Sequence, residues 1–325
     1  MNPNTLKKIQ RLKNGESFVT SEPGNSMLPL YKSNEKHLVT PITWQECNVG
    51  DVVFCKVRGS CFTHKVYSVD PNRGCLIGNN KGHMNGLKMF MAQIMKICIL
   101  SDLHGFLIDN IQPCELVLIC GDIVPLRMQR NKPQCEKWLK TEFADWIKSL
   151  PCEKVVFVAG NHDFVFENRE FMWVNSIITF PTEGKAVYLD NSHFDYLSND
   201  GKVYRIYGTP ACHIFGNWAF MYSDEKLKEL YQNIPGNCDI LISHDAPKLN
   251  NCGLVPPNMW HSTPVDAGNE VLASAILDKK PKYAFCGHIH EGNHQLTDIG
   301  VTKIANVSIL DDAYDISYEP LYLDI

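Results

Sequence analysis

The stretch Met-Lys-Ile-Cys-Ile-Leu-Ser-Asp-Leu-His, residues 95–104, joins an apolar run to two metal-binding residue types. A short apolar run of this kind predicts a buried β-strand, and Asp102 and His104 follow directly where that strand ends. The same arrangement returns four times along the chain: Cys-Gly-Asp-Ile at 120–123, Ala-Gly-Asn-His-Asp at 159–163, Ile-Ser-His-Asp at 242–245 and Cys-Gly-His-Ile-His at 286–290. Five strands that each end in such residues can surround one site.

The order Asp-x-His, Gly-Asp, Gly-Asn-His, His and Gly-His-x-His resembles the signature of the calcineurin-like metallophosphoesterases, over about residues 95–325. All ligand positions of that signature are filled here. The resemblance implies an α/β fold, a β-sandwich flanked by helices, that binds two divalent metal ions and hydrolyses phosphoesters. Carried over position by position, it implies that one metal is bound by Asp102, His104, Asp122 and His290, and the other by Asp122, Asn161, His244 and His288.

The residue types fit this chemistry. A carboxylate such as Asp122 has two oxygens and suits a bridging position, and metals about 3.5–4 Å apart can hold a bridging hydroxide for in-line attack on phosphorus. Oxygen and nitrogen ligands without sulfur suit Mn, Fe, Ni or Zn, of which we favour Mn. In the family, the His of Gly-Asn-His is not a ligand, so the resemblance implies that His162 protonates the leaving alkoxide, a role that suits a near-neutral pKa.

Two observations indicate the branch of the superfamily. The stretch Gly-Asp-Ile-Val-Pro-Leu-Arg at 121–127 lacks the second Asp and the Arg-Gly of the protein Ser/Thr phosphatases. Further stretches resemble the small phosphodiesterase group that includes the brain metallophosphodiesterases and their bacterial relatives: Tyr-Gly-Thr-Pro at 207–210, Trp-Ala-Phe at 218–220, Gly-His-Ile-His-Glu-Gly at 287–292 and Asn-Val-Ser at 306–308. That resemblance implies phosphodiester substrates, cyclic nucleotides among them. We expect Trp218 and Phe220 to be core aromatics rather than a base-stacking platform.

A metal-dependent nuclease is the enzymatic alternative. Long nucleic acid usually requires a Lys/Arg stripe with interleaved aromatics, whereas the local basic runs here, Arg127/Arg130 with Lys132 and Lys279-Lys280 with Lys282, are typical of solvated helix ends. The net charge of −5 also provides no global attraction for nucleic acid or an anionic membrane. Small substrates are therefore favoured. A non-enzymatic binding or regulatory fusion is the other alternative.

Composition is ordinary for a globular protein, with 44% hydrophobic and 21% charged residues among 325. No apolar run approaches the 18 or so residues of a spanning helix, and the N-terminus lacks the apolar region of a secretory signal, so we expect no membrane partner. The 13 cysteines include no Cys-x-x-Cys pair, and several lie in strand-like runs. Buried reduced thiols in a cytoplasmic protein are the expectation.

The pattern of elements changes near residue 92, which predicts two domains, 1–92 and 93–325. Before it, a short helix at 4–14 precedes strand-like runs at 51–57, 61–69 and 75–77, which predict a small all-β domain. After it, strands alternate with helices, as in stacked sheets flanked by helices: strands at 95–101, 115–120, 154–159, 203–207, 239–243, 283–286 and 303–309, and helices at 133–149, 223–233 and 267–278. Residues 246–268, rich in Pro, Gly and Asn, predict a loop at the mouth of the site.

The N-terminal domain has its own motif. Gly-Asn-Ser-Met-Leu-Pro at 24–29, Gly-Asp-Val-Val at 50–53 and His-Lys-Val at 64–66 resemble the boxes of the signal peptidase and SOS-repressor autoprotease superfamily. The resemblance implies Ser26 as nucleophile and His64, or less favourably Lys65, as its base, since serine attacks when a neighbour accepts its proton. Asn79 stands where an Asp is usual. The alternative is a β-domain retained for binding or oligomerisation.

Overall fold

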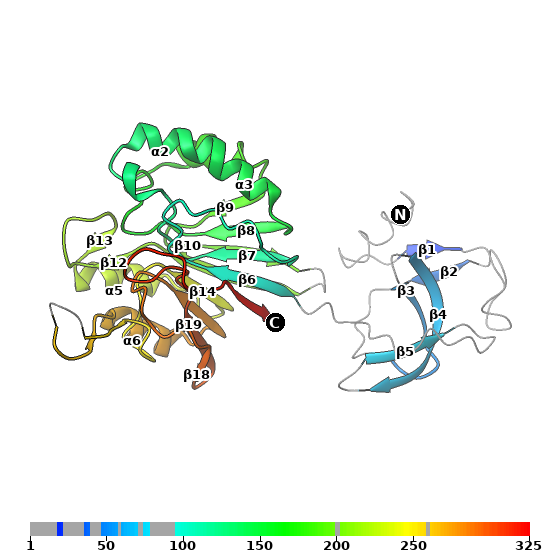
Figure 1. The fold of residues 1–325 in the computed structure, drawn as a ribbon. Helices are drawn as coiled ribbons and strands as arrows, with labels where there is room; N and C mark the ends of the chain where they lie inside the picture. Colours follow the sequence, from blue (N-terminus) through cyan, green and yellow to red (C-terminus); the bar gives the residue numbers. More distant parts are fainter. Residues whose placement is uncertain are drawn as a thin grey trace. The chain divides into compact units, whose positions relative to one another are not determined.

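The computed structural model describes residues 18–21, 36–39, 47–57, 60–70, 74–78, 95–198, 202–257 and 261–325. The chain falls into two compact units, Met1–Ile94 and Met95–Ile325, which are coloured from blue to cyan and from cyan to red in Figure 1. The helix expected at 4–14 and residues Ser26 and Asn79 lie outside the described residues. Within the described residues, no helix is long and apolar enough to cross a membrane.

The described elements of the first unit are strands. β1 (Phe18–Thr20) and β2 (His37–Val39) pair antiparallel. β3 (Val52–Val57), β4 (Ser60–Asp70) and β5 (Gly74–Gly78) form a second antiparallel sheet at the positions that the sequence predicts. One face of this sheet buries a small cluster of side chains: Cys47, Val53, Val66, Cys75 and Ile77.

The second unit contains two large sheets. The first has the order β20 (Leu321–Asp324), β6 (Lys96–Leu100), β7 (Leu116–Ile119), β8 (Lys154–Phe157) and β9 (Ala186–Tyr188). Strands β6 to β9 run parallel, and β20 is antiparallel to β6. Met95 and Ile325 exchange two backbone hydrogen bonds of 3.1 Å, which extend the antiparallel pairing of β20 with β6 by one residue on each strand. The terminal strand β20 was not predicted.

The second sheet has the order β10 (Ser192–Leu197), β11 (Val203–Thr209), β14 (Ile240–Ser243), β17 (Tyr283–Cys286), β19 (Thr302–Asn306) and β18 (Thr297–Ile299). Its four central strands are parallel, and both edge strands are antiparallel to their neighbours. Two small pairs lie outside the sheets: β12 (Cys212–His213) with β13 (Met221–Tyr222), and β15 (Leu254–Val255) with β16 (Val265–Asp266). The latter pair lies within the loop expected at 246–268.

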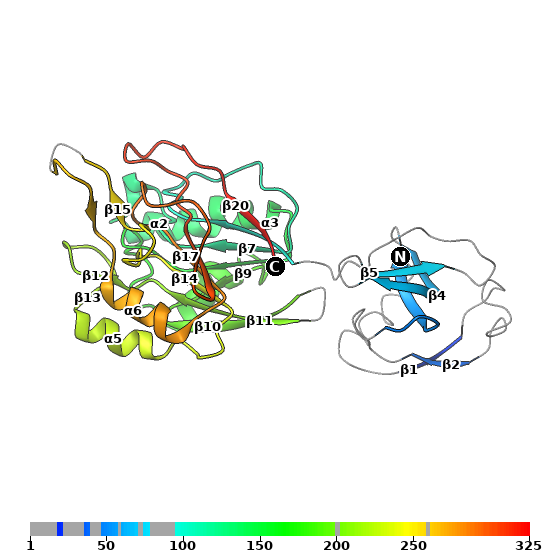
Figure 2. The same ribbon diagram turned by 90° about the horizontal axis from the view of Figure 1, so that it is seen from below.

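Helices cover the outer faces of both sheets (Figures 1 and 2). The helix predicted at 133–149 is a continuous run of α2 (Lys132–Trp138), a π-helical turn (Leu139–Phe143) and α3 (Ala144–Ser149). A short helix α4 (Phe171–Val174) continues into another π turn (Asn175–Thr179). On the other side lie α5 (Asp224–Gln232) and α6 (Glu270–Lys279). Side chains of Asn131, Ser223 and Asn269 cap the N-termini of α2, α5 and α6, as polar caps commonly do.

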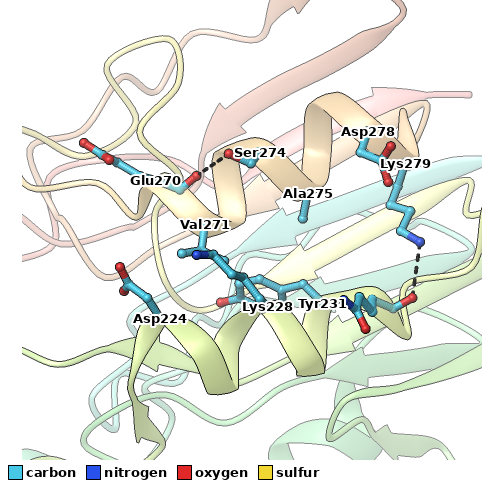
Figure 3. Close-up of a pocket in the computed structure, with 10 residues that line it drawn as sticks. Asp224, Lys228, Tyr231, Glu270, Val271, Ser274, Ala275, Asp278 and Lys279 are labelled. Atoms are coloured by element: carbon cyan, nitrogen blue, oxygen red, sulfur yellow. Dashed lines mark hydrogen bonds between the residues drawn. The ribbon is translucent and has the colours of Figure 1, made fainter.

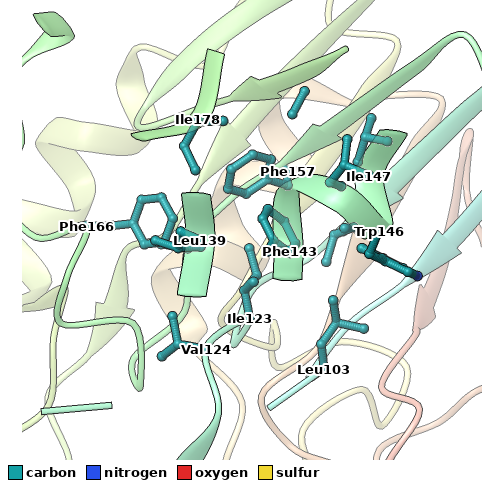
Figure 4. Close-up of a cluster of buried hydrophobic side chains, with 14 of the residues drawn as sticks. Leu103, Ile123, Val124, Leu139, Phe143, Trp146, Ile147, Phe157, Phe166 and Ile178 are labelled. Carbon is teal, nitrogen blue, oxygen red and sulfur yellow. The ribbon is translucent and has the colours of Figure 1, made fainter. Parts of the chain in front are cut away.

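Alternation along the strands explains the layers. In β6, Ile97 and Ile99 point into the core between the two sheets, and Cys98 and Leu100 point toward the helical layer. Both faces of a parallel strand are buried in this way. The cluster under α2 and α3 includes Phe143, Phe157 and Phe166 (Figure 4). A third cluster joins the second sheet to α5 and α6. The result is a helix–sheet–sheet–helix sandwich, in which truncation of a fully buried Phe to Ala costs about 3–5 kcal/mol.

Most cysteines contribute to these cores. The cysteines whose side chains the structure describes carry free thiols, and all of them are buried except Cys114 and Cys152, which are half-buried. The prediction of buried thiols is confirmed for this part of the chain.

Candidate metal centre

The carboxyl ends of parallel strands from both sheets meet at one edge of the second unit. From the first sheet, Asp102 and His104 follow β6, Asp122 follows β7 and Asn161 follows β8; from the second sheet, His244 follows β14, and His288 and His290 follow β17. A parallel bridge between Ser101 and Ser308 ties the two sheets together at this edge. Open α/β sheets bind ligands beyond the carboxyl ends of their strands, so the topology brings the predicted ligands to one place.

The backbone at this edge is strained. Asp102, His104, Asp122 and His288 have φ values of 58°, 40°, 51° and 69°, in the left-handed region that non-glycine residues rarely adopt. Gly121 also has a positive φ of 104°, and a Cβ there would lie 2.5 Å from Nδ1 of His244. Such strain persists where the surrounding structure requires it, and it clusters at functional sites.

Three buried groups of side chains bring ligand atoms within 4.8 Å of one another: Asp102 with His104 and His290, His104 with Asp122 and His162, and Asp102 with Asp122 and His244. Asp122 is central, because its Oδ2 lies 3.4 Å from Nε2 of both His104 and His244. Nε2 of His290 lies 3.6 Å from Oδ1 of Asp102. The geometry therefore matches a cluster with Asp122 between two groups of ligands.

The other two predicted ligands adjoin the same cluster. Oδ1 of Asn161 lies 2.8 Å from Nε2 of His244. The ring of His288 is 5.1 Å from that of His244, and its backbone N–H donates to both carboxylate oxygens of Asp102, at 3.1 and 3.2 Å. All seven predicted ligand residues thus come together. The assignment of each to a particular metal stays a prediction.

Backbone carbonyls orient two of the imidazoles. Nδ1 of His244 lies 2.9 Å from the carbonyl oxygen of Cys120, and Nδ1 of His290 lies 2.7 Å from that of Asp311. In each case Nδ1–H donates to the carbonyl, which leaves Nε2 directed at the carboxylates. Metal-ligating histidines commonly have this arrangement, because a hydrogen bond at one nitrogen fixes the tautomer at the other.

These atoms fit a cation. When Nδ1–H of His244 donates to Cys120, the neutral ring presents a lone pair at Nε2, which faces the acceptor oxygens of Asn161 and Asp122. Three acceptors converge favourably only around a proton or a metal ion. His104 supports the same conclusion, because both of its ring nitrogens are buried without a hydrogen-bond partner among the described residues. A buried polar atom without a partner is costly, and a bound metal would satisfy it.

The charges agree with this interpretation. Burial lowers the pKa of His104 and His288 to about 4. Burial also lowers the pKa of His244 and His290, but the carboxylates of Asp122 and Asp102 outweigh it and raise these values to about 10 and about 9. In the absence of metal, the two buried carboxylates therefore hold protons on neighbouring imidazoles. The buried carboxylates thus stabilise positive charge in the site, and bound divalent cations would supply that charge in place of the protons.

His162 lies beside this cluster. Its backbone N–H donates to Oδ1 of Asp122 at 2.8 Å, and its Nε2 lies 3.9 Å from Oδ2 of the same carboxylate. Trp218 stacks on the ring, with centroids 4.5 Å apart and planes inclined by 33°. Trp218 is half-buried, whereas Phe220 is buried. The expectation of core aromatics is therefore confirmed for Phe220 and wrong for Trp218, which packs against the site.

The sequence did not single out several residues that support the site. The buried Asp163 accepts hydrogen bonds from the backbone N–H groups of Ile123, Val124 and Gly160, so it joins the loops that carry Asp122 and Asn161. Burial and the neighbouring Asp122 raise its pKa to about 7. Asp163 and Asp245, a second supporting carboxylate, have one signal in the sequence: each directly follows a histidine of the site.

Asp245 forms a second buried support next to His244. Its Oδ2 accepts hydrogen bonds of 2.9 Å from Nδ1 of His213 and 2.8 Å from the side-chain amide of Asn269. Asn269 also caps α6, so this carboxylate links the helix to His213 on strand β12. Tyr314 closes a further side, with its ring 5.1 Å from His104 and 5.0 Å from His290.

Two hollows are present in the second unit. One, of about 470 Å³, lies between α5 and α6, is lined by residues such as Lys228, Tyr231 and Val271, and contains none of the predicted ligands (Figure 3). The other, of about 700 Å³, is formed by residues 126–133. It adjoins the candidate metal centre, because Gln129 in its lining contacts His162.

The predicted N-terminal site is described only in part. Ser26 lies outside the described residues. His64 lies on β4 opposite Val53, and it is 8% exposed. The Ser26–His64 pair stays a prediction.

Comparisons with known proteins agree with the second unit. A family model described as calcineurin-like phosphoesterase matches residues 95–292. The chain is similar to the human metallophosphoesterase domain-containing protein 1, with 28% identity over 202 residues, which are 57% of this chain and 59% of the relative. It is also similar to UPF0046 protein C25E10.12 of Caenorhabditis elegans, with 29% identity over 185 residues, which are 55% of this chain and 64% of that relative.

The chain thus spans less than two thirds of the length of these relatives. Among solved structures, it is similar to a phosphopantetheinyl hydrolase from Mycobacterium tuberculosis, with a TM-score of 0.42 and 14% identity, covering 66% of this chain and 89% of that one. The family model matches more than half of the 325 residues. The chain therefore belongs to the calcineurin-like phosphoesterases, a family of metal-dependent phosphoester hydrolases.

Proposed function

We propose that the second unit is a two-metal phosphodiesterase that hydrolyses small diesters, including cyclic nucleotides. The observation that carries this proposal is the buried convergence of Asp122 Oδ2, His244 Nε2 and Asn161 Oδ1, where a proton on Nε2 takes the place of a cation in the metal-free chain. Only a cationic centre makes such a buried arrangement favourable. Family membership supports the same class of reaction.

The residues divide around the bridging carboxylate. Asp102, His104 and His290 would hold one metal ion with Asp122, and Asn161, His244 and His288 would hold the other with Asp122. When bound, two divalent cations supply an activated water and neutralise charge on the phosphate. Their oxygen and nitrogen donors suit Mn, Fe, Ni or Zn, and we favour Mn.

His162 provides the remaining chemistry in this proposal. Its Nε2 faces the Asp122 carboxylate at 3.9 Å, so a phosphate held at the centre would lie within reach of the ring. Protonated at Nε2, His162 donates to the leaving oxygen as the P–O bond breaks, which general acids of this kind do with gains of about 10²–10⁴-fold. Trp218 stacks on a face of the ring, and Gln129 contacts its Nδ1, the nitrogen that does not face Asp122.

The surroundings favour a small anionic substrate. Arg127, Arg130 and Lys132 line the hollow of residues 126–133 beside His162, and Trp218 is half-exposed next to it. A cation and an aromatic ring together suit a nucleotide. They form a local patch rather than a long basic stripe, and this supports a small diester over the alternative of nucleic acid cleavage.

For the first unit, we keep two alternatives: a serine peptidase module that uses Ser26 and His64, and a β-domain for binding. The antiparallel sheet of β3, β4 and β5, with His64 on its central strand, is compatible with both. For the whole chain, the buried free thiols favour a reducing compartment, and we propose the cytoplasm.

One experiment tests the proposed hydrolase. Purified protein reconstituted with Mn²⁺ is assayed against cyclic nucleotides, short oligonucleotides and phosphomonoesters, and its metal content is measured in parallel. We expect about two metal ions per chain and preference for the small diesters. Preference for oligonucleotides would identify a nuclease. A chain that binds no metal and hydrolyses none of the three would support the non-enzymatic alternative.

A further inference from the structure

Gln129 contacts the histidine that the proposed mechanism uses as an acid. Its side-chain Oε1 lies in hydrogen-bonding contact with Nδ1 of His162. The two residues are 33 positions apart, and Gln129 follows a 3₁₀ turn at Leu126–Met128 that immediately precedes α2. Nothing in the Gly-Asn-His motif points to this contact. It occurs on the side of the imidazole opposite to the nitrogen that faces Asp122.

The ring of His162 is held on a second side. Trp218 stacks on it at 4.5 Å, and the edge of His104 meets it at 4.9 Å. The backbone N–H of His162 donates to Asp122 at 2.8 Å. These contacts fix the backbone and the ring plane of His162. Two properties of the ring are still free: which nitrogen faces the leaving group, and which nitrogen carries the hydrogen.

Arg130 joins the two elements that touch His162. Its guanidinium donates to the carbonyl oxygen of Asn217 at 2.9 Å, and it lies 4.2 Å from the ring centroid of Phe164 and 5.2 Å from that of Trp218. The turn that carries Gln129 is therefore tied to the turn that carries Trp218. A guanidinium over aromatic rings is attracted to them, so this contact helps to hold the two turns together.

We propose that Gln129 is a positioning residue, which with Trp218 holds the His162 ring so that Nδ1–H stays bonded to the glutamine and Nε2 faces the leaving group. This inference rests on the proposed function and adds to it a residue that the family signature does not include. Gln129 itself touches neither substrate nor metal in this assignment, and it acts through His162.

The proton balance follows directly. The imidazolium carries hydrogens on both nitrogens, and Nε2–H passes to the leaving oxygen as that oxygen takes the electron pair of the breaking P–O bond. Nδ1–H stays with Gln129, so the product is the neutral Nδ1–H tautomer, and water returns the proton to Nε2. Without Gln129, the ring can turn by 180° or exchange tautomers, and a misplaced donor costs rate without loss of substrate binding.

The test uses Gln129→Ala and Gln129→Glu in the full chain, because Glu keeps an acceptor where Ala removes it. Gln134→Ala is the matched control, since Gln134 is exposed on the neighbouring helix α2. Each protein is assayed with Mn²⁺ on a diester with an alkoxide leaving group and on a nitrophenyl diester. We expect Gln129→Ala to lose about 10-fold or more in kcat on the alkoxide diester, which is part of the roughly 10²–10⁴-fold that a general acid contributes. On the nitrophenyl diester the loss should be small, and KM and metal content should change little. Gln129→Glu should recover most of the loss on the alkoxide diester.

A measurement without activity separates the inference from the proposed function. Nitrogen-15 NMR of the metal-free protein, with the His162 signals assigned through His162→Gln, should show the Nδ1–H tautomer in wild type and in Gln134→Ala, and a mixture in Gln129→Ala. An Nε2–H tautomer in wild type, or His162 signals that Gln129→Ala leaves unchanged, would overturn the inference. Equal kinetic losses on both diesters would do so as well. If wild type cleaves neither diester but shows the expected tautomer, the proposed function fails while the positioning contact stands.

Discussion

Nε2 of His244 lies 2.8 Å from Oδ1 of Asn161, although Nδ1 of the same ring is directed at the Cys120 carbonyl 2.9 Å away. A neutral imidazole whose Nδ1–H is engaged in this way presents an acceptor to another acceptor. The Asp122 carboxylate lies 3.4 Å from the same Nε2. In the metal-free chain a proton on Nε2 of His244 holds this contact, and a cation bound by His244, Asn161 and Asp122 would take the place of that proton.

Asp122 should be the most damaging ligand to remove, because it faces ligands of both predicted metals. Asp122→Asn keeps the shape but removes a charge that shields two dications from each other. We expect near-complete loss of diester hydrolysis, bound metal well below two ions per chain and a retained fold. Metal analysis, circular dichroism and rates after stripping and reloading with Mn²⁺ check this. Wild-type turnover in the reloaded variant would contradict the bridging assignment.

His162→Ala should retain both metals and lose activity selectively. A ribose alkoxide needs a proton in order to leave, whereas nitrophenolate does not, so the loss should be about 10²–10⁴-fold on a nucleotide diester and much smaller on a nitrophenyl diester. Comparison of kcat for the two substrates, with metal content measured on the same samples, checks this. Equal losses would indicate that His162 only positions the phosphate.

The second unit should function without the first. β6 begins at Lys96, and its strand partners β7 and β20 both belong to the same unit. Residues 93–325 expressed alone should be soluble and should hydrolyse model diesters at a rate close to that of the full chain. Aggregation or inactivity of this fragment would show that the predicted boundary cuts through a shared core.

The peptidase prediction for Ser26 and His64 can be tested separately. An electrophilic serine probe should label the wild-type protein, and both Ser26→Ala and His64→Ala should abolish labelling, because the nucleophile needs its base. Diester hydrolysis should be the same in all three proteins. If wild type remains unlabelled and intact on long incubation, the first unit is better described as a binding domain.

The His213–Asp245 pair should make stability depend on pH. The hydrogen bond that His213 Nδ1–H donates to the Asp245 carboxylate raises the pKa of His213 in the folded protein, above the unfolded value of about 6.5. Its contribution is therefore complete below about pH 6.5 and is lost as the pH rises through the folded value. Hydrogen bonds to charged groups contribute about 1.5–3 kcal/mol, and partial exposure places this one at the lower end.

Denaturant unfolding of metal-free wild type and His213→Gln at pH 5.5 and pH 9 checks this prediction. The difference in unfolding free energy between the two proteins should be larger at pH 5.5. A difference that is the same at both pH values would show that His213 contributes through packing alone.

The local pattern of the sequence was sufficient for the central parallel strands and the longer helices of the second unit. Apolar runs at 95–101, 115–120 and 154–159 correspond to β6, β7 and β8, and Ser223 and Asn269 mark the starts of α5 and α6 as side-chain caps. Such signals depend on residues within one turn or one strand, so they survive without tertiary context. The edge strands β9, β10, β18 and β20 were missed. For β20 the reason is that its pairing with β6 joins residues more than 200 positions apart.

The sequence alone also determined which residue types stand at the ends of the parallel strands, and these include all seven predicted ligands. Only the tertiary structure decided which other residues support them. Asp163 bonds to backbone N–H groups about 40 positions away, and Gln129 meets His162 across two loops. Trp218 packs on His162 and not in the core. These contacts form between loops that are distant in the sequence and come together only when the two sheets pack. The spacing of residues along the chain therefore does not predict them.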